Sequence, residues 1–424
     1  MFPNIIRIRQ KASATAIENV SRYIEENLEK TSFNFSDFEG KKVGITAGSR
    51  GISNYSKILK TIVDKVKDAK GYPIIIPSMG SHGGGTIEGQ LEVLASLGIT
   101  ENTVGAPIAK NIHVERIGQT PGGIPVYCNV EAIKVDKLIV LNRVKPHTDF
   151  EGQIESGICK MFAIGLGSVE GCVNIHSHAL VNGYEEIITG AAELMIKQLP
   201  VAFAVAVLEN WKGETADVKI LLPCEIIEKE KEVLKEVKSS MIKLPFKAID
   251  VLVIGEIGKN ISGTGMDTKV VGRIMVKGQK EPDYPKIGRI VVLNLTTESH
   301  GNAIGIGLAD ITTEKVFNSI DIRSTSLNSI SSMSPEQGRL PCILASDKEA
   351  IHSALLTLGA VDAHKVRLVY IQNTLNLENF AVSKALVDEV QKNEKLEVMG
   401  TLEEMRFEHD GTLVNFRGDN YAKH

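Results

Sequence analysis

The sequence predicts an α/β protein of two domains, each built on a mainly parallel sheet. Short apolar runs typical of buried strands alternate with amphipathic helix patterns in the first half of the chain, and a second series of strand patterns follows residue 243. The 424 residues exceed the roughly 250 to 300 at which a single core stops growing. A hydrophobic fraction of 43% and a charged fraction of 24% are typical of globular proteins.

The first half contains successive strand and helix patterns. Residues 43–47 and 73–77 are apolar and predict buried strands, and residues 135–144 predict a third. Residues 55–71 and 86–95 carry apolar side chains at helical spacing. Because each of these helices follows a strand, we expect parallel strands joined by helices that cover the sheet.

The domain boundary is predicted near residue 244. A highly charged helix pattern at residues 225–243 leads into Pro245, which cannot continue a helix. Strand patterns then follow at residues 248–256, 289–296, 341–346 and 366–371. We therefore expect an N-terminal catalytic domain over residues 1–243 and a C-terminal α/β domain over residues 244–424.

Charge and cysteine content disfavour several classes of partner and compartment. The chain has 48 basic and 52 acidic residues, and its net charge of −4 gives no electrostatic basis for binding nucleic acid or an anionic membrane. Its five cysteines form no CxxC pair, which favours a reducing compartment. No run reaches the roughly 18 apolar residues of a membrane span. We expect a cytoplasmic protein without nucleic-acid or membrane partners.

Three polar loops follow predicted strands. They are GSRG with Arg50, GSHGGG with His82 and KPHTDF with His147. In open α/β sheets ligands bind outside the carboxyl ends of the strands, so we expect these side chains to converge on one crevice. An arginine between two glycines favours bidentate capture of a carboxylate or phosphate.

The loop after His82 is also suited to an anion. Gly83, Gly84 and Gly85 leave backbone N–H groups accessible, and Thr86 is a typical N-cap for the helix that follows. The N-terminal end of a helix favours negative charge. We expect this loop to bind a ligand or cofactor anion.

Residues 142–178 gather the strongest signs of chemistry, and their five glycines predict a loose backbone. His147 is a possible base, and Lys160 precedes the apolar run MFAIGLG, where an amine is unfavourable without a task or a partner. His176 and His178 are possible metal ligands. Their spacing places them on opposite faces of a strand or well apart on a helix, so we expect only one to face the site.

Three motifs of this chain resemble the lactate racemase family, the isomerases that depend on a nickel-pincer nucleotide. They are SMGSHGGGTIEGQLEVL, NRVKPHTDFEGQIESGICKM and GKNISGTGMD. The resemblance implies two α/β domains with the active site in the cleft between them. It also implies a cofactor derived from a pyridinium mononucleotide, whose sulfur groups hold nickel and which cofactor-biosynthesis enzymes supply.

The resemblance also implies roles for residues that match the motifs. His82 and His147 look like the paired acid and base, and Arg50 resembles the arginine that holds the substrate carboxylate. A lysine of the C-terminal domain is expected near the substrate. Lys259 is the preferred candidate and Lys269 the second.

Cofactor contacts are implied in the same way. Lys160 looks like the lysine to which the cofactor is tethered, and His176 like the protein ligand to nickel, with His178 as its alternative. The loop of residues 83–86 is the expected cofactor-binding loop.

The chain differs from the lactate enzymes in two places. At Ala47 and Gly48 it lacks the acidic residues of their motif, and Glu155 and Cys159 stand where they have small residues. Covalent attachment of the cofactor to Lys160 and non-covalent binding both remain open.

The expected function is a racemase or epimerase that inverts C2 of a 2-hydroxy acid by reversible hydride transfer to the nickel-pincer nucleotide. Removing the C2 hydrogen as hydride avoids a carbanion beside a carboxylate, and a base on each side serves both enantiomers. Two alternatives remain. One is a zinc-type hydrolase or lyase that holds a divalent ion with His82, His147 and His176. The other is a non-catalytic protein that binds an organic acid or nucleotide through Arg50 and the GGG loop.

Overall fold

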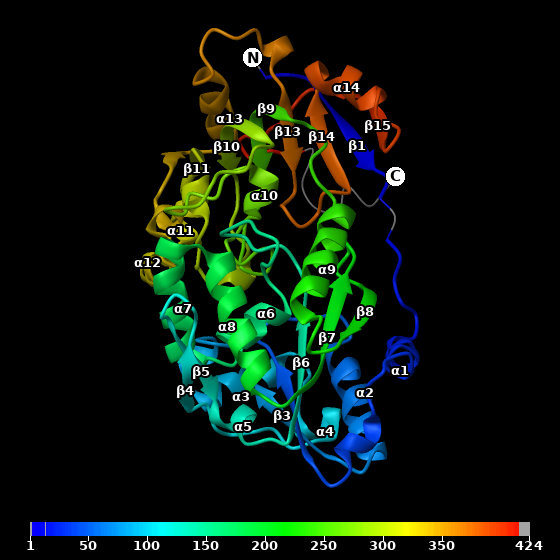
Figure 1. Cartoon of the computed structure of the whole chain (residues 1–424). Helices are drawn as coiled ribbons and strands as arrows, with labels where there is room; N and C mark the ends of the chain where they lie inside the picture. The colour runs from blue at the N-terminus through cyan, green and yellow to red at the C-terminus, as the bar shows by residue number, and fades with distance from the viewer. Residues whose placement is uncertain (1, 13, 415–424) are drawn as a thin grey trace. The chain divides into compact units, whose positions relative to one another are not determined.

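The structure is a computed structural model that describes residues 2–12 and 14–414 (Figure 1). Its contacts divide the chain into two compact units. The first, here called the N-terminal unit, contains residues 14–147 and 151–241. The second, the C-terminal unit, contains residues 2–12, 148–150 and 242–414. Both contain a sheet and helices, so the predicted α/β class is confirmed.

The N-terminal unit contains a five-stranded sheet whose first four strands are parallel. In sheet order the strands are β3 (Tyr72–Pro77), β2 (Lys42–Ala47), β6 (Lys137–Arg143), β7 (Val201–Glu209) and the antiparallel β8 (Thr215–Leu221). The three predicted strands correspond to β2, β3 and β6. A separate antiparallel ribbon pairs β4 (Val114–Gln119) with β5 (Pro125–Asn129).

Nine α-helices accompany this sheet among the described residues of the unit. They are α1 (Val20–Glu29), α2 (Tyr55–Asp68), α3 (Ile87–Ser96), α4 (Glu101–Val104), α5 (Val130–Ile133), α6 (Ile158–Lys160), α7 (Ser168–Asn182), α8 (Tyr184–Gln198) and α9 (Ile226–Ser240). The predicted helices at 55–71 and 86–95 are α2 and α3. The apolar face of α2 is buried with that of α1 against β2, which explains its strong sequence pattern.

Residues 158–182 are helical, whereas the sequence suggested a loose, glycine-rich stretch. A π-helix at Met161–Gly165 continues α6, and α7 follows after a bend of 109°. A Cβ at Gly167 would lie 2.9 Å from the Cα of Gly171, so glycine allows close backbone packing here. No single helix in the described part of the chain is long and apolar enough to span a membrane; only this bent pair reaches that length and composition together.

The C-terminal unit contains an eight-stranded mixed sheet. Its parallel strands are, in sheet order, β12 (Cys342–Leu344), β11 (Ile311–Thr313), β10 (Lys286–Val292), β9 (Ala248–Ile254) and β13 (Leu368–Ile371). The antiparallel strands β14 (Asn379–Ser383), β1 (Ile5–Gln10) and β15 (Leu396–Glu403) complete it. Alternate residues of β9 enter different apolar clusters, so both faces of this strand are covered. The helices are α10 (Thr268–Val271), α11 (Glu314–Ser319), α12 (Ile322–Ser331), α13 (Asp347–Leu356) and α14 (Val387–Gln391).

Strand β1 departs from the boundary that the sequence suggested. It precedes residue 243, yet Ile8 pairs with Phe380 of β14 and with Val398 of β15, and both Ile5 and Ile8 are fully buried in this sheet. Local patterns cannot reveal a pairing across some 370 residues, so the sequence analysis did not predict this strand.

Candidate active site

Arg50, His82 and His147 follow neighbouring parallel strands of the N-terminal unit. Arg50 lies three residues after β2, His82 five after β3, and His147 four after β6. Because β2 pairs in parallel with both β3 and β6, the three loops leave the sheet at the same edge. This is the edge where open α/β sheets bind ligands.

His82 is an exposed side chain held by two hydrogen bonds at one ring nitrogen. Its Nδ1 lies 3.0 Å from the carbonyl oxygen of Met79 and 2.8 Å from the hydroxyl of Ser49. A carbonyl only accepts, so Nδ1 carries the hydrogen. In the neutral ring the lone pair therefore sits on Nε2, the nitrogen that can act as a base.

The three glycines after His82 form a turn that requires glycine. Gly83, Gly84 and Gly85 have φ values of 65°, 66° and 68°, in the left-handed region. A Cβ at Gly83 would lie 2.5 Å from the backbone carbon of Gly89. Thr86 then caps α3, as predicted, by accepting a hydrogen bond from the N–H of Gly89.

His147 and Lys160 meet directly. The amine Nζ of Lys160 lies 2.6 Å from Nε2 of His147, and both side chains are half-buried. His147 belongs to a loop closed by two backbone hydrogen bonds between Lys145 and Ser156. Lys160 stands at the junction of α6 and the π-helix, an irregularity that is frequent at functional sites.

His176 on α7 completes this group through Tyr184. The Nδ1 of His176 lies 3.4 Å from the hydroxyl of Tyr184, and the Tyr184 ring also stacks near His147 at 6.4 Å between centroids. Burial, and then the charges of Lys160 and His82, lower the pKa of His176 from 6.5 to about 4. His176 is therefore neutral at physiological pH, the form that binds metals.

His178 points its ring at its own helix. Its Nδ1 lies 2.8 Å from the carbonyl oxygen of Asn174, one turn earlier on α7. The expectation that only one of the two histidines faces the other candidate residues agrees with these contacts, and His176 is that one.

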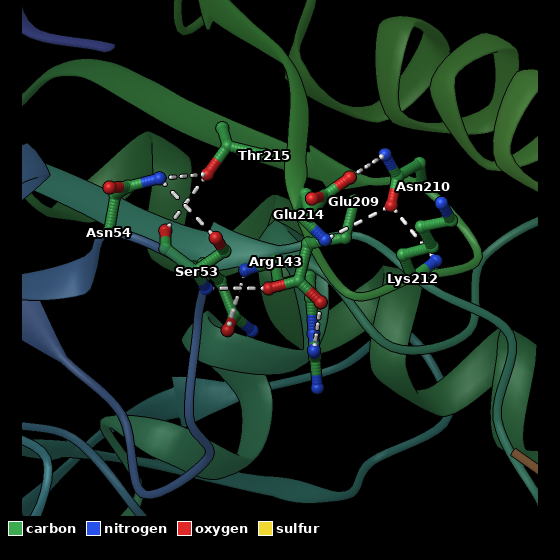
Figure 2. Close-up of polar contacts among 9 residues, drawn as sticks. Ser53, Asn54, Arg143, Glu209, Asn210, Lys212, Glu214 and Thr215 are labelled. Atoms are coloured by element: carbon green, nitrogen blue, oxygen red, sulfur yellow. Dashed lines mark hydrogen bonds and ion pairs between the residues drawn. The ribbon is translucent and has the colours of Figure 1, made fainter. Parts of the chain in front are cut away.

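Arg50 is accompanied by a second arginine that the sequence reasoning missed. Arg143, at the end of β6, forms an ion pair with Glu209 at the end of β7, and the N–H of Ser53 donates to the other Glu209 oxygen at 2.7 Å. Figure 2 shows this carboxylate between Arg143 and the Ser53 backbone. Arg50 is exposed at its surface, but the surrounding protein partly desolvates its guanidinium. This desolvation, and then the charge of Arg143, lower the pKa of Arg50, which nevertheless stays charged.

The lysine candidates of the C-terminal unit make hydrogen bonds within that unit. Lys259, in the loop after β9, donates to the carbonyl of Gly263 at 2.7 Å and to the side chain of Asn328 at 2.9 Å. Lys269, on α10, donates to the carbonyl of Phe150 at 3.3 Å.

The sequence analysis missed Arg143 and Tyr184, and only Arg143 could have been found from its sequence context. Arg143 lies in the same motif as His147 and at a strand end, so the logic used for Arg50 would have found it. Tyr184 begins α8 after Gly183, and nothing in its sequence context indicates that it touches two histidines.

The first part of the chain is similar to a known protein family. Residues 4–187 match the family described as the lactate racemase N-terminal domain. The match covers less than half of the chain, and it shows that this part is similar to that family. The matched residues include His82, His147, Lys160 and His176.

Solved structures extend the similarity of fold to most of the chain. The lactate racemase apoprotein from Thermoanaerobacterium thermosaccharolyticum aligns with a TM-score of 0.55 and 15% identity, covering 87% of this chain and 94% of that protein. A protein from Thermotoga maritima aligns with a TM-score of 0.51 and 14% identity, covering 84% and 96%. No curated protein sequence matches the chain. The chain thus has a lactate racemase-like fold, and its residues 4–187 are similar to the N-terminal domain of that family.

Proposed function

We propose that this protein is a racemase or epimerase that inverts C2 of a 2-hydroxy acid with a nickel-pincer nucleotide as cofactor. The observation that carries the proposal is the contact between Lys160 and His147 beside a neutral His176, within the residues that match the lactate racemase N-terminal domain. In this proposal the three residues serve as an amine, a base and a metal donor of one site. A substrate site between the two domains stays a prediction from the resemblance.

The donor set fits a cofactor that brings its own metal ligands. In the described ranges, 2–12 and 14–414, no three His, Cys, Asp or Glu side chains are grouped so that they could hold a metal ion. His176 offers one neutral nitrogen. A nickel ion here would therefore take most of its donors from the cofactor, and the sulfur groups of a pincer nucleotide would supply them.

The contact between Lys160 and His147 suits a tethering lysine. An amine must lose a proton before it forms an amide-type bond, and Nε2 of His147 is 2.6 Å away to accept it. The glycine turn at residues 83–85, followed by the start of α3, is the proposed cradle for the cofactor phosphate.

The remaining residues handle the substrate. Nε2 of His82 and the ring of His147 take and return the hydroxyl proton, one for each enantiomer, while Arg50 holds the carboxylate through its guanidinium. Lys259 is the proposed substrate lysine of the C-terminal domain. The bound cofactor supplies the acceptor and donor for the C2 hydrogen.

The zinc-type alternative lacks the geometry it needs. It required His82, His147 and His176 to converge on one ion, and the described residues contain no such three-ligand group. The non-catalytic alternative is separated from a racemase by experiment, because it predicts ligand binding without exchange at C2.

The test measures cofactor binding, metal content and turnover in one preparation of the protein. The protein is produced in a host that makes the cofactor, its metal is measured, and optical rotation is followed with single enantiomers of a panel of 2-hydroxy acids. We expect bound nickel and decay of rotation with at least one acid. Bound zinc without a chromophore, together with constant rotation throughout the panel, would contradict the proposal.

Intact mass then decides how the cofactor is held. An adduct on the wild type that is absent from Lys160→Ala indicates a covalent tether, whereas nickel without an adduct indicates non-covalent binding. Lys197→Ala is a matched control, because Lys197 is an exposed lysine on α8 of the same unit.

A further inference from the structure

Helix α9 sends two charged side chains to the segment that carries Lys160 and His147. Glu230 and Lys238 lie about two turns apart on α9. The first reaches the backbone before Lys160, and the second reaches the loop that contains His147. The sequence analysis gave neither residue a role.

Glu230 holds the start of the short helix that carries Lys160. Its side chain is 1% exposed, and its Oε2 accepts a hydrogen bond from the N–H of Cys159 at 2.7 Å. A Cβ at Gly157 would lie 2.0 Å from the other oxygen, Oε1, so the backbone packs directly on the carboxyl group. Glycine at this position is therefore needed for the contact.

Oε1 of Glu230 has no hydrogen-bond partner among the residues that the structure describes. Burying a carboxyl group with one unpartnered oxygen is unfavourable unless the group does something for the fold or the site. Here its other oxygen holds the backbone N–H of Cys159, one residue before Lys160.

Lys238 holds the loop of His147 through Glu155. The Glu155 side chain is fully buried and accepts hydrogen bonds from the N–H groups of His147, at 2.5 Å, and Gly152, at 3.0 Å. Lys238 lies 2.5 Å from a Glu155 oxygen and donates to the carbonyl of Gly152 at 2.8 Å. Its charge compensates the buried carboxylate, which would otherwise be strongly destabilising.

We propose that α9 is the positioning element of this site, with Glu230 fixing the Lys160 turn and Lys238, through Glu155, fixing the His147 loop. Both anchors come from one helix, so together they set the contact between Lys160 and His147. None of the three touches a reacting atom, and they are positioning residues. Supports of this kind hold active-site groups within the narrow tolerance that catalysis needs.

The first experiment uses the protein without cofactor, so it does not depend on the proposed function. The ring signals of His147 are followed by NMR with labelled histidine and assigned with His147→Gln. Lys160→Met gives the reference shift for a broken contact. We expect Glu230→Ala and Lys238→Met to move the His147 signals toward that reference, and Glu230→Gln, which keeps an acceptor of the same size, to restore the wild-type signals.

Controls come from the same helix. Glu232 and Lys235 are exposed on α9, and Glu232→Ala and Lys235→Met should leave the His147 signals unchanged. Circular dichroism checks that each variant is folded. Should Lys238→Met fail to fold, Glu155→Gln tests the same anchor, because it removes the charge that Lys238 compensates.

The second experiment uses the loaded enzyme and rests on the proposed function. We expect Glu230→Ala and Lys238→Met to lower kcat by about 10- to 100-fold, as loss of supporting contacts does, with KM for the hydroxy acid within about threefold of wild type. Glu230→Gln should recover most of kcat. Wild-type His147 signals and kcat in both disrupting variants would overturn the positioning role.

The two ideas fail separately. If the wild type racemises no acid while the His147 signals respond as expected, α9 positions the pair and the proposed function is wrong. If the wild type racemises an acid and the His147 signals do not change in the Glu230 and Lys238 variants, the proposed function stands and the positioning role is wrong.

Discussion

The candidate site contains an exposed region and a buried region, and they favour different chemistry. Arg50 and His82 are exposed on loops after parallel strands, whereas Lys160 and His176 belong to a helical segment packed among apolar side chains. In the second region, burial lowers the pKa of His176 and brings the Lys160 amine against His147. The exposed loops suit substrate capture and proton exchange with solvent, and the buried segment suits a resident cofactor.

The largest effect is expected in the buried region. His176→Ala and Lys160→Ala should each lower racemase activity by at least about 10³-fold, because a misplaced or lost cofactor removes the reaction path itself. Nickel content and intact mass are measured beside the rate. His113→Ala, an exposed histidine of the same unit, is the control. Full activity in either variant would remove the cofactor role from the buried region.

A smaller effect is expected for the exposed base. His82→Ala should lower kcat by about 10² to 10⁴-fold with one enantiomer as substrate, the range for loss of a general base. Nickel and cofactor should stay bound, since His82 belongs to the exposed region and not to the buried region proposed to hold the cofactor. Loss of the cofactor together with activity would show that His82 also contributes to cofactor binding. Unchanged turnover would favour the non-catalytic alternative.

The sequence predicted those features of the two regions that depend on residues close together in the chain. The strands β2 and β3 and the helix α2 were expected because their apolar periodicity lies within a few residues. The loops with Arg50 and His82 followed from those strands. The exposed region was therefore largely predictable.

The buried region was predicted by residue type but not by structure. Residues 158–182 contain glycines, which suggested a loose backbone, yet their glycines serve close helix packing. Tyr184 and Glu230 reach the site from other helices, and β1 pairs with β14 across the length of the chain. These contacts depend on tertiary structure, for which one sequence gives no local pattern.

The buried carboxyl group of Glu230 makes stability depend on pH. Burial raises its pKa from 4.5 to about 7. The unfolded chain therefore releases this proton first as pH rises, so stability from Glu230 is fully present below about pH 4.5 and is lost as pH rises through about 7. At about 1.4 kcal/mol per pKa unit, the change amounts to about 3 kcal/mol across that window.

Glu230→Gln tests this dependence. We expect its free energy of unfolding, measured with urea at pH 5 and pH 8, to fall less between the two values than that of the wild type, by about 3 kcal/mol. Glu232→Gln, on the exposed side of α9, should behave as the wild type does. Parallel curves for Glu230→Gln and the wild type would show that the carboxyl group is ionised in the folded protein and is less isolated from water than its 1% exposure indicates.

The smallest effect is expected at Arg50, where the loop is exposed and a second arginine is close. Arg50→Lys keeps the charge but loses the planar fork that matches a carboxylate, so KM for the hydroxy acid should rise by about tenfold. Because the carboxylate is held equally before and during the reaction, kcat should change by no more than a few-fold. Arg116→Lys, on the exposed ribbon strand β4, is the control. A fall in kcat with constant KM would instead place Arg50 beside the reacting carbon. The exposed region would then contribute to the chemical step as well as to substrate binding.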